Sequence, residues 1–263
     1  MLTIALYFAN VAWWLETEIL DSESFVETTL VAMEDEATRD AAAAIIVDTL
    51  SDEFPLLRLL DTALIALFSD LIGRDVIEPL IVETSIDVHR RIIEGDQSEL
   101  IIDLDPYRGL LLAPLESLSP QLAALVPDDW FRSVEVLEEG TLPDLATYTR
   151  RTKPAAIIAT LLSLGLVAVI LTTARRWFAA STAIGMAFVL AGGFSALLVP
   201  GARSTATIFL NDEPSTVLLT GVFNAFTQPL VFRSLAILAV GVLLLVAALL
   251  GWLVDQDRNA TVA

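Results

Sequence analysis

Residues 154–172 read PAAIIATLLSLGLVAVILT, a run of 19 residues with no charged side chain. Two similar runs follow, one of 22 residues at 178–199 and one of 21 residues at 234–254. At about 1.5 Å of rise per helical residue, these runs extend roughly 28–33 Å, which matches the ~30 Å hydrocarbon core of a bilayer. The sequence therefore predicts a domain of three transmembrane helices within residues 151–263.

The chain begins with another apolar run, residues 2–15, which is shorter than the other three. Leu2–Leu15 contains only Thr3 and Asn10 as polar residues, and it ends with two tryptophans, a residue type that sits at the level of lipid headgroups. At about 14 residues it reaches roughly 21 Å, which is less than a full crossing. It lacks the basic start and the cleavage site of a secretory signal. We interpret residues 1–20 as a partial or shortened first transmembrane helix, with an interfacial helix as the alternative.

The charges are divided unequally along the chain. Residues 16–149 hold 30 acidic and 7 basic side chains, and residues 150–263 hold 4 acidic and 8 basic ones, so −23 and +4 give the net charge of −19. Such a chain repels phosphate groups and lacks a basic stripe, which excludes nucleic acid as a partner. Dense carboxylates stay hydrated and are screened in concentrated salt, which indicates a halophilic source. An acidic surface in ordinary salt is the alternative.

The acidic domain, residues 21–150, is predicted to be mainly α-helical. Ser24 and Glu27 fit a capping box at the start of its first helix. Three further helices are expected from apolar periodicity and from proline and glycine positions, over residues 36–52, from Pro55 to Gly73, and over 75–94 before Gly95.

Residues 100–152 of the acidic domain and the connection at 200–233 between the last two apolar runs show shorter sequence patterns. The alternating runs at 100–104 and 133–137 predict two paired strands, and a helix over 142–152 is expected to continue past Pro154 into the first complete span. The connection at 200–233 is expected to be a loop that contains an amphipathic helix at 215–226, lying on the membrane surface or under the acidic domain.

Several short motifs resemble a known family. Leu20, Asp21, Ser22, Glu23, Phe25 and Val26 follow the first apolar run, TRDAAAAIIVDTL and LIIDLDP come later, and TQPL precedes the last span. This pattern resembles a family of uncharacterised prokaryotic, halophile-type integral membrane proteins. The resemblance implies an acidic helical domain outside the cytoplasm after the first span, and it implies no reaction. Typical members of that family have a longer, basic-flanked first helix.

Residues with catalytic or metal-binding chemistry are few. The chain has no cysteine, which excludes disulfides and thiolate sites, and its one histidine, His89, lacks the ligand spacing of known metal motifs. Glu83, Asp87 and Arg91 are spaced for an ion-pair ladder on a helix. The acidic clusters Glu34-Asp35-Glu36 and Asp128-Asp129 do not fit a calcium loop. We therefore expect a solvated acidic face, no catalytic, cofactor or metal site, and no enzymatic activity.

Within the three predicted spans no residue is ionisable, which argues against a pump or coupled transporter. Ala183, Ala187 and Ala191 recur every four residues and predict a small-residue ridge for helix packing. The favoured function is a non-enzymatic membrane protein that presents its acidic domain to an envelope partner, another membrane complex or a second copy. The alternative is a channel or transporter for a small or lipidic solute, with polar groups from Thr160, Ser163, Ser181 and Ser195.

The orientation in the membrane has two opposing indicators. On the side of the acidic domain lie five basic residues, Arg150, Arg151, Lys153, Arg203 and Arg233, against Arg175, Arg176 and Arg258 on the other side. The positive-inside rule applied to this count favours a cytoplasmic domain. The compact Arg175-Arg176 turn and the basic N-terminus of the resembled family favour an extracytoplasmic one. We expect the acidic domain of a multi-pass cell-membrane protein to lie outside.

Overall fold

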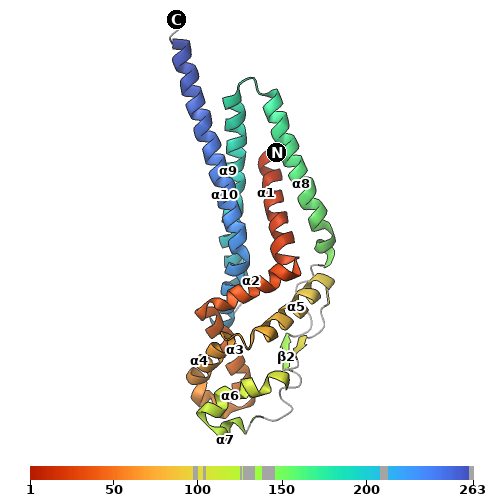
Figure 1. The fold of residues 1–263 in the computed structure, drawn as a ribbon, viewed down its shortest axis with the longest axis vertical. Coiled ribbons are helices and arrows are strands. Elements are labelled where there is room, and N and C mark those ends of the chain that lie inside the picture. Colours follow the sequence, from red (N-terminus) through yellow and green to blue (C-terminus); the bar gives the residue numbers. More distant parts are fainter. Residues whose placement is uncertain are drawn as a thin grey trace. The chain divides into compact units, whose positions relative to one another are not determined.

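The computed structural model describes residues 1–96, 100–102, 105–124, 126, 134–137, 146–207 and 213–260. The chain forms two compact units (Figure 1). Unit 1 contains residues 1–19, 150–205 and 227–263, and unit 2 contains residues 20–149 and 206–226. Both units are mainly helical in their described parts.

Unit 2 is built from helices that bury one apolar face each. They are α2 (Ser22–Glu34), α3 (Glu36–Glu53), a 3₁₀ segment (Pro55–Leu60), α4 (Asp61–Ile72), α5 (Glu78–Glu94), α6 (Arg108–Leu118) and α7 (Pro120–Ala123). Leu57, Leu64 and Phe68 are almost fully buried at the centre of the core, where Val47 of α3 and Leu112 of α6 join them. Apolar burial thus holds this acidic chain segment together, with its charges on the outside.

The ends of these helices follow the expected residue types, with one correction. The N-cap of α2 is Asp21, three residues before the predicted Ser24 cap, because the carboxylate of Asp21 accepts a hydrogen bond from the Ser24 backbone N–H at 2.9 Å. Helix α4 ends at Gly73 as predicted. Helix α5 ends at Gly95, whose φ of 72° lies in the left-handed region that glycine adopts without strain.

A short sheet completes the described part of unit 2. Strand β1 (Leu100–Ile102) pairs antiparallel with β2 (Val134–Leu137), with Ile101 opposite Glu135 and an irregularity between Leu100 and Ile101. Residues 103–104 and 133, which belong to the predicted strand pair, lie outside the described residues. The pairing of these two strands brings together the two ends of the chain segment that carries α6 and α7.

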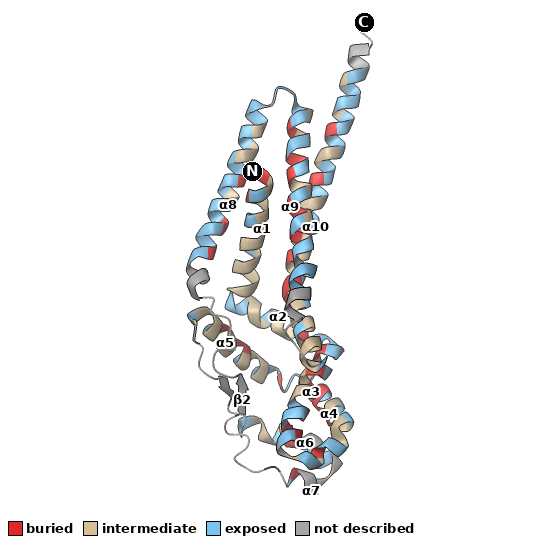
Figure 2. Cartoon of the chain, turned by 180° about the vertical axis from the view of Figure 1, so that it is seen from behind, coloured by how far each residue is buried: buried red, intermediate tan, exposed pale blue. Residues whose placement is uncertain are grey.

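Unit 1 contains helices long and apolar enough to cross a membrane. Helix α8 (Ala146–Thr173) runs through Pro154 as predicted, and α9 (Trp177–Thr207) and α10 (Glu213–Ala260) follow. Their candidate spans are Arg151–Thr173, Trp177–Arg203 and Glu213–Gln256. About 33% of the most apolar stretch of α9 is buried, against 11% for each of the other two (Figure 2). Helix α9 is therefore the inner helix, and many apolar side chains of α8 and α10 are exposed, as a lipid-facing surface requires.

The predicted loop at 200–233 is wrong. Helix α9 continues to Thr207 with Pro200 inside it, and α10 is one helix from Glu213 to Ala260 with Pro229 inside it. Prolines are tolerated within membrane helices because neighbouring groups satisfy the freed carbonyls. Residues 215–226, predicted as a separate amphipathic helix, are helical but form part of α10. Residues 213–226 of α10 belong to unit 2, whereas residues 227–260 belong to unit 1.

The first part of α10 packs closely within unit 2. A Cβ atom at Gly221 would come within 3.0 Å of the Cβ and Cγ2 atoms of Thr38, whose side chain is fully buried. Phe226 stacks on Phe25 of α2 with a ring-centroid distance of 5.0 Å. Glycine is needed at position 221 because α10 and α3 approach too closely for a side chain.

Candidate functional site

A buried amide–hydroxyl pair joins α1 (Leu2–Trp14) to α10 inside unit 1. The Nδ2 atom of Asn10 donates to the Oγ atom of Ser234 at 3.0 Å, and this hydroxyl donates to the carbonyl of Leu230 at 2.7 Å. Asn10 is only 8% exposed and Ser234 is fully buried. In an apolar environment such a pair is retained because breaking it would leave buried polar groups without partners.

An ion pair extends this contact toward the end of the bundle. The Arg233 guanidinium lies 3.0 Å from the Glu18 carboxylate. Glu18 belongs to a π-helical turn (Leu15–Ile19) that follows α1, and π-turns recur where a helix must re-aim a side chain. Arg233 directly precedes the buried Ser234 in α10, so this ion pair adjoins the buried amide–hydroxyl pair in sequence. We call Asn10, Glu18, Arg233 and Ser234 the polar seam.

Sequence reasoning did not identify Arg233 as a partner of the first helix. The charge-free run was taken to start at Ser234, and Arg233 lies just before it in the same long helix, α10. The signal that could have found the seam is Asn10, the one amide in the first apolar run.

Further contacts tie α1 to the other helices of unit 1. The indole Nε1 of Trp13 donates to Thr160 Oγ1 of α8 at 2.9 Å, and Leu2 packs in an apolar cluster with Ile184 and Ala187 of α9. Thr160 also donates to its own helix at Ala156, as Ser163 does at Ala159. Helix α1 is therefore an integral part of the bundle, and both hydroxyls donate within their own helix, with Thr160 also accepting from Trp13.

The predicted packing ridge is only partly buried. Ala187 and Ala191 are buried, but Ala183 is exposed. The closest approach of α9 to α10 is made instead by Gly185, Gly192 and Gly241. A Cβ at Gly192 would lie 2.6 Å from the Ser234 carbonyl oxygen, and one at Gly185 would lie 2.9 Å from the Gly241 carbonyl oxygen. Backbone thus packs on backbone along these three glycines, which we call the glycine contact.

The other two polar residues proposed for a solute path are Ser181 and Ser195. Ser181 is partly buried, and the Oγ atom of Ser195 is buried without a hydrogen-bond partner among the described residues. By the register of the glycine contact, Ser195 is level with the polar seam, since it lies three residues beyond Gly192, which faces Ser234 and Leu238. The bundle therefore concentrates its polar groups at one level.

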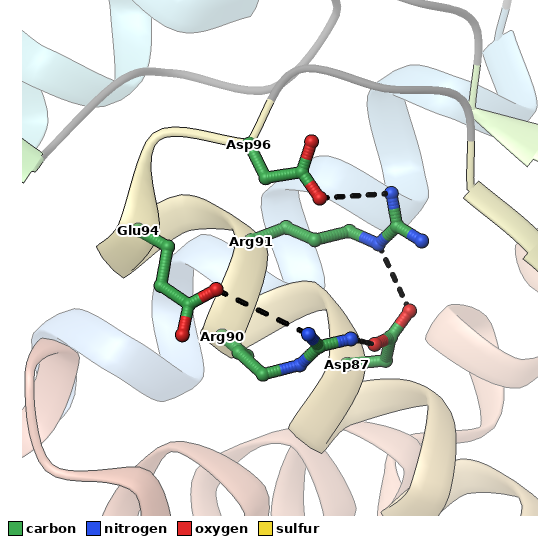
Figure 3. Close-up of polar contacts among 5 residues, drawn as sticks. All are labelled: Asp87, Arg90, Arg91, Glu94 and Asp96. Atoms are coloured by element: carbon green, nitrogen blue, oxygen red, sulfur yellow. Dashed lines mark hydrogen bonds and ion pairs between the residues drawn. The ribbon is translucent and has the colours of Figure 1, made fainter.

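His89 is a buried residue of α5 in unit 2, and charged residues near it in the same helix form ion pairs. His89 is 6% exposed, and its ring lies 4.9 Å from that of Phe25. On the same helix, Asp87 accepts hydrogen bonds from Arg90 and from Arg91, the latter at 2.9 Å (Figure 3). Arg91 also pairs with Asp96 at 3.7 Å, and Arg90 with Glu94 at 4.0 Å. Among the described residues, no group of three or more acidic or histidine side chains could hold a metal ion.

The ion-pair ladder changes the acidity of its carboxylate. Partial burial, the largest influence on Asp87, opposes ionisation, but the hydrogen bonds and charges of Arg90 and Arg91 together outweigh it, so the pKa of Asp87 lies below its ordinary value. Glu83, the first member of the predicted ladder, is exposed. The ladder therefore begins at Asp87 and runs toward the end of α5 at Glu94 and Asp96.

The acidic cluster at residues 34–36 forms a corner between two helices. Asp35 caps α3 by accepting from the N–H and the hydroxyl of Thr38 at 2.9 and 2.8 Å, and the Thr38 hydroxyl is the main cause that lowers the pKa of Asp35. Arg39 donates to the carbonyls of Met33 and Glu34 at the end of α2. Asp128-Asp129 lies outside the described residues.

Arg39 also lines two surface hollows of unit 2. One hollow of about 400 Å³ is lined by Glu34, Arg39, Arg74 and Asp75 together with apolar side chains that include Leu30 and Ile72. Its charges are mixed, and Arg39 already bonds to the helix carbonyls within it. Comparisons with protein-family models, with curated proteins and with solved structures each gave no match, so the polar seam and the contacts of α10 are the features on which a function is built.

Proposed function

We propose that this chain is a non-enzymatic, multi-pass membrane protein that presents an acidic helical domain outside the cytoplasm to an envelope partner or another membrane complex. The observation that carries the proposal is α10. One helix supplies residues 213–226 to unit 2 and residues 227–260 to unit 1. A chain that only anchored a domain would need no shared helix, because a flexible linker after a span would be sufficient.

The contacts at both parts of α10 support a presenting role. Gly221 packs on the buried Thr38 in unit 2, and Gly241 packs on Gly185 in unit 1. Ser234 adds its hydrogen bond to Asn10 in unit 1. These are specific, close contacts on separate stretches of one helix, so α10 is firmly packed within each of the units to which it contributes.

A channel or transporter for a small or lipidic solute is the second candidate, and Ser195 is the observation that favours it. Its buried hydroxyl has no partner among the described residues, at the level where Asn10 and Ser234 meet. Against it, Thr160 and Ser163 donate to carbonyls of their own helix, and the glycine contact closes α9 onto α10. If a solute passes at this level, Ser195→Ala should abolish flux into proteoliposomes. Unchanged flux would remove this candidate.

The orientation can be measured because the chain has no native cysteine. Asp96→Cys and Asn259→Cys variants are labelled in intact cells with a membrane-impermeant maleimide. We expect labelling at position 96 alone, with both positions labelled after lysis. Labelling of intact cells at position 259 alone would place the acidic domain in the cytoplasm and would overturn the proposed presentation to an envelope partner.

The partner itself is tested by photocrosslinking. Leu59 is the most exposed leucine described in unit 2, at 85%, and Ile158 is an exposed apolar residue of α8 in unit 1. A photoreactive amino acid at position 59 should give a discrete, stoichiometric protein adduct after purification in mild detergent and high salt. The matched variant at position 158 should crosslink to lipid. A monomer without adduct at position 59 and at other exposed sites of unit 2, in several detergents, would count against the presenting role.

A further inference from the structure

Basic side chains gather in one layer at one end of unit 1. Glu18 lies eight residues beyond Asn10, and Arg203 lies eight residues beyond Ser195, which puts both roughly 12 Å from the level of the Asn10–Ser234 hydrogen bond at 1.5 Å per residue. Lys153 lies seven residues before Thr160, the partner of Trp13, and therefore reaches the same layer. The layer contains Arg151, Lys153 and Arg203, and the guanidinium of Arg233 meets Glu18 of this layer in an ion pair.

Helix α8 adds an apolar stripe directly beside this layer. Lys153, Ile157 and Leu161 are spaced four residues apart, so they lie on one face of the helix. Lys153 is exposed, and Ile157 and Leu161 are 43% and 63% exposed. Arg151, Ile158 and Leu162 repeat the arrangement on the neighbouring face, with every side chain exposed. Each face therefore carries a cation at its end and large apolar groups along its length.

We propose that this surface of α8 binds an anionic phospholipid, with Arg151 and Lys153 contacting the headgroup phosphate and the exposed stripe contacting an acyl chain. A cation followed by an apolar stripe is complementary to a charged amphiphile, whereas a free phosphate would use only the cations. Trp13, bonded to Thr160 beside the stripe, is of the aromatic type that prefers the headgroup level. Lys153 is the only lysine of the chain, and it lies in this layer.

The test measures lipid binding to the full chain in detergent by native mass spectrometry, with phosphatidylglycerol and phosphatidylcholine as probes. We expect preferential binding of phosphatidylglycerol. Removing one interfacial cation should weaken this binding about fivefold, and Arg151→Gln with Lys153→Gln about thirtyfold. Lys153→Arg should bind like the wild type. The charge-matched control, Arg58→Gln with Arg74→Gln, removes two exposed arginines of unit 2 and should not change binding.

Three results would overturn the proposal. They are equal binding of the two lipids by the wild type, equal binding of phosphatidylglycerol by the double variant and the wild type, or displacement of phosphatidylglycerol by inorganic phosphate at similar concentration. The last result would show a phosphate site without a lipid contribution. If the double variant fails to fold, Ile157→Asn with Leu161→Asn tests the acyl-chain contact separately, and unchanged phosphatidylglycerol binding by this variant would equally refute it.

Discussion

The close packing of α10 on α3, at Gly221 and Thr38, can be tested directly by mutation. Gly221→Ala places a methyl group within 3.0 Å of two carbon atoms of Thr38 and still closer to its hydroxyl. Overpacking of this kind costs about 2 kcal/mol, and the better helix propensity of alanine returns about 1 kcal/mol. The substitution should therefore destabilise unit 2 by about 1 kcal/mol, although glycine-to-alanine changes in helices usually stabilise.

The same substitution should become nearly neutral when Thr38 is shortened. Thr38→Ala removes the hydroxyl and the methyl group that meet the new side chain and leaves the Cβ at 3.0 Å, so the remaining contact offsets the helix propensity of alanine. The coupling between the two sites is about 1 kcal/mol, or roughly a fivefold change in the unfolding equilibrium. The hydrogen bond from Thr38 to Asp35 at 2.8 Å is lost in both Thr38→Ala variants and cancels in the cycle.

Pulse proteolysis across a urea series, in mild detergent and molar potassium chloride, measures the unfolding of unit 2 in the four proteins of the cycle. Gly109→Ala in α6 is the matched control, because a Cβ there would have no neighbour within 4 Å. It should not destabilise. Equal effects of Gly221→Ala with and without Thr38 would refute the packing of α10 on α3.

Three further outcomes are expected. Gly192→Ile should lower the melting temperature in detergent, with a cost of about 2 kcal/mol or more, whereas Gly193→Ile, whose Cβ has open space, should not; equal melting temperatures would refute the glycine contact. Lowering potassium chloride from about 1 M to about 0.1 M lengthens the screening distance from about 3 to about 10 Å, so protease cuts should appear within residues 21–150 before they appear in the spans; equal resistance would show that the acidity is no salt adaptation. Since the pKa values of Asp35 and Asp87 are lowered in the folded state, their stabilisation is present above the ordinary value of 3.8 and is lost as the pH falls through the folded pKa values. Asp87→Asn should flatten this acid-induced loss in circular dichroism, and an unchanged profile would contradict the ladder's contribution.

The sequence predicted best those helices whose signals are local. The expected helix at 36–52 is α3 (Glu36–Glu53), and the expected end at Gly95 is a left-handed glycine after α5. Apolar periodicity and a glycine after the last turn act over a few residues, so a single sequence contains them. The three apolar runs likewise lie within the three candidate spans by length and composition alone.

The errors came from residues whose meaning depends on their surroundings. Residues 200–233 were predicted as a loop, but Pro200 and Pro229 within this range both lie inside helices. Ser24 was taken as a cap, although Asp21 three residues earlier supplies the better acceptor. Ala183 shares the spacing of Ala187 and Ala191 but is exposed, since the helix face that meets α10 is fixed by the glycines.

The polar seam was beyond prediction because its partners are distant in sequence. Asn10 and Ser234 are separated by 224 positions, and Glu18 and Arg233 by 215. Nothing in the local pattern around Asn10 indicates which helix it meets. Pairings over such distances follow from tertiary packing, which a helical period does not encode.

The division of unit 2 into residues 20–149 and 206–226 has a consequence for biosynthesis. Gly221 and Phe226, which complete the packing around Thr38 and Phe25, leave the ribosome only after both α8 and α9 have been made. The acidic domain therefore cannot reach its final fold as a nascent chain that emerges first. Its completion waits for the insertion of two apolar helices, so a chain that fails to insert also lacks a finished domain and exposes the surface around Thr38 to cellular proteases.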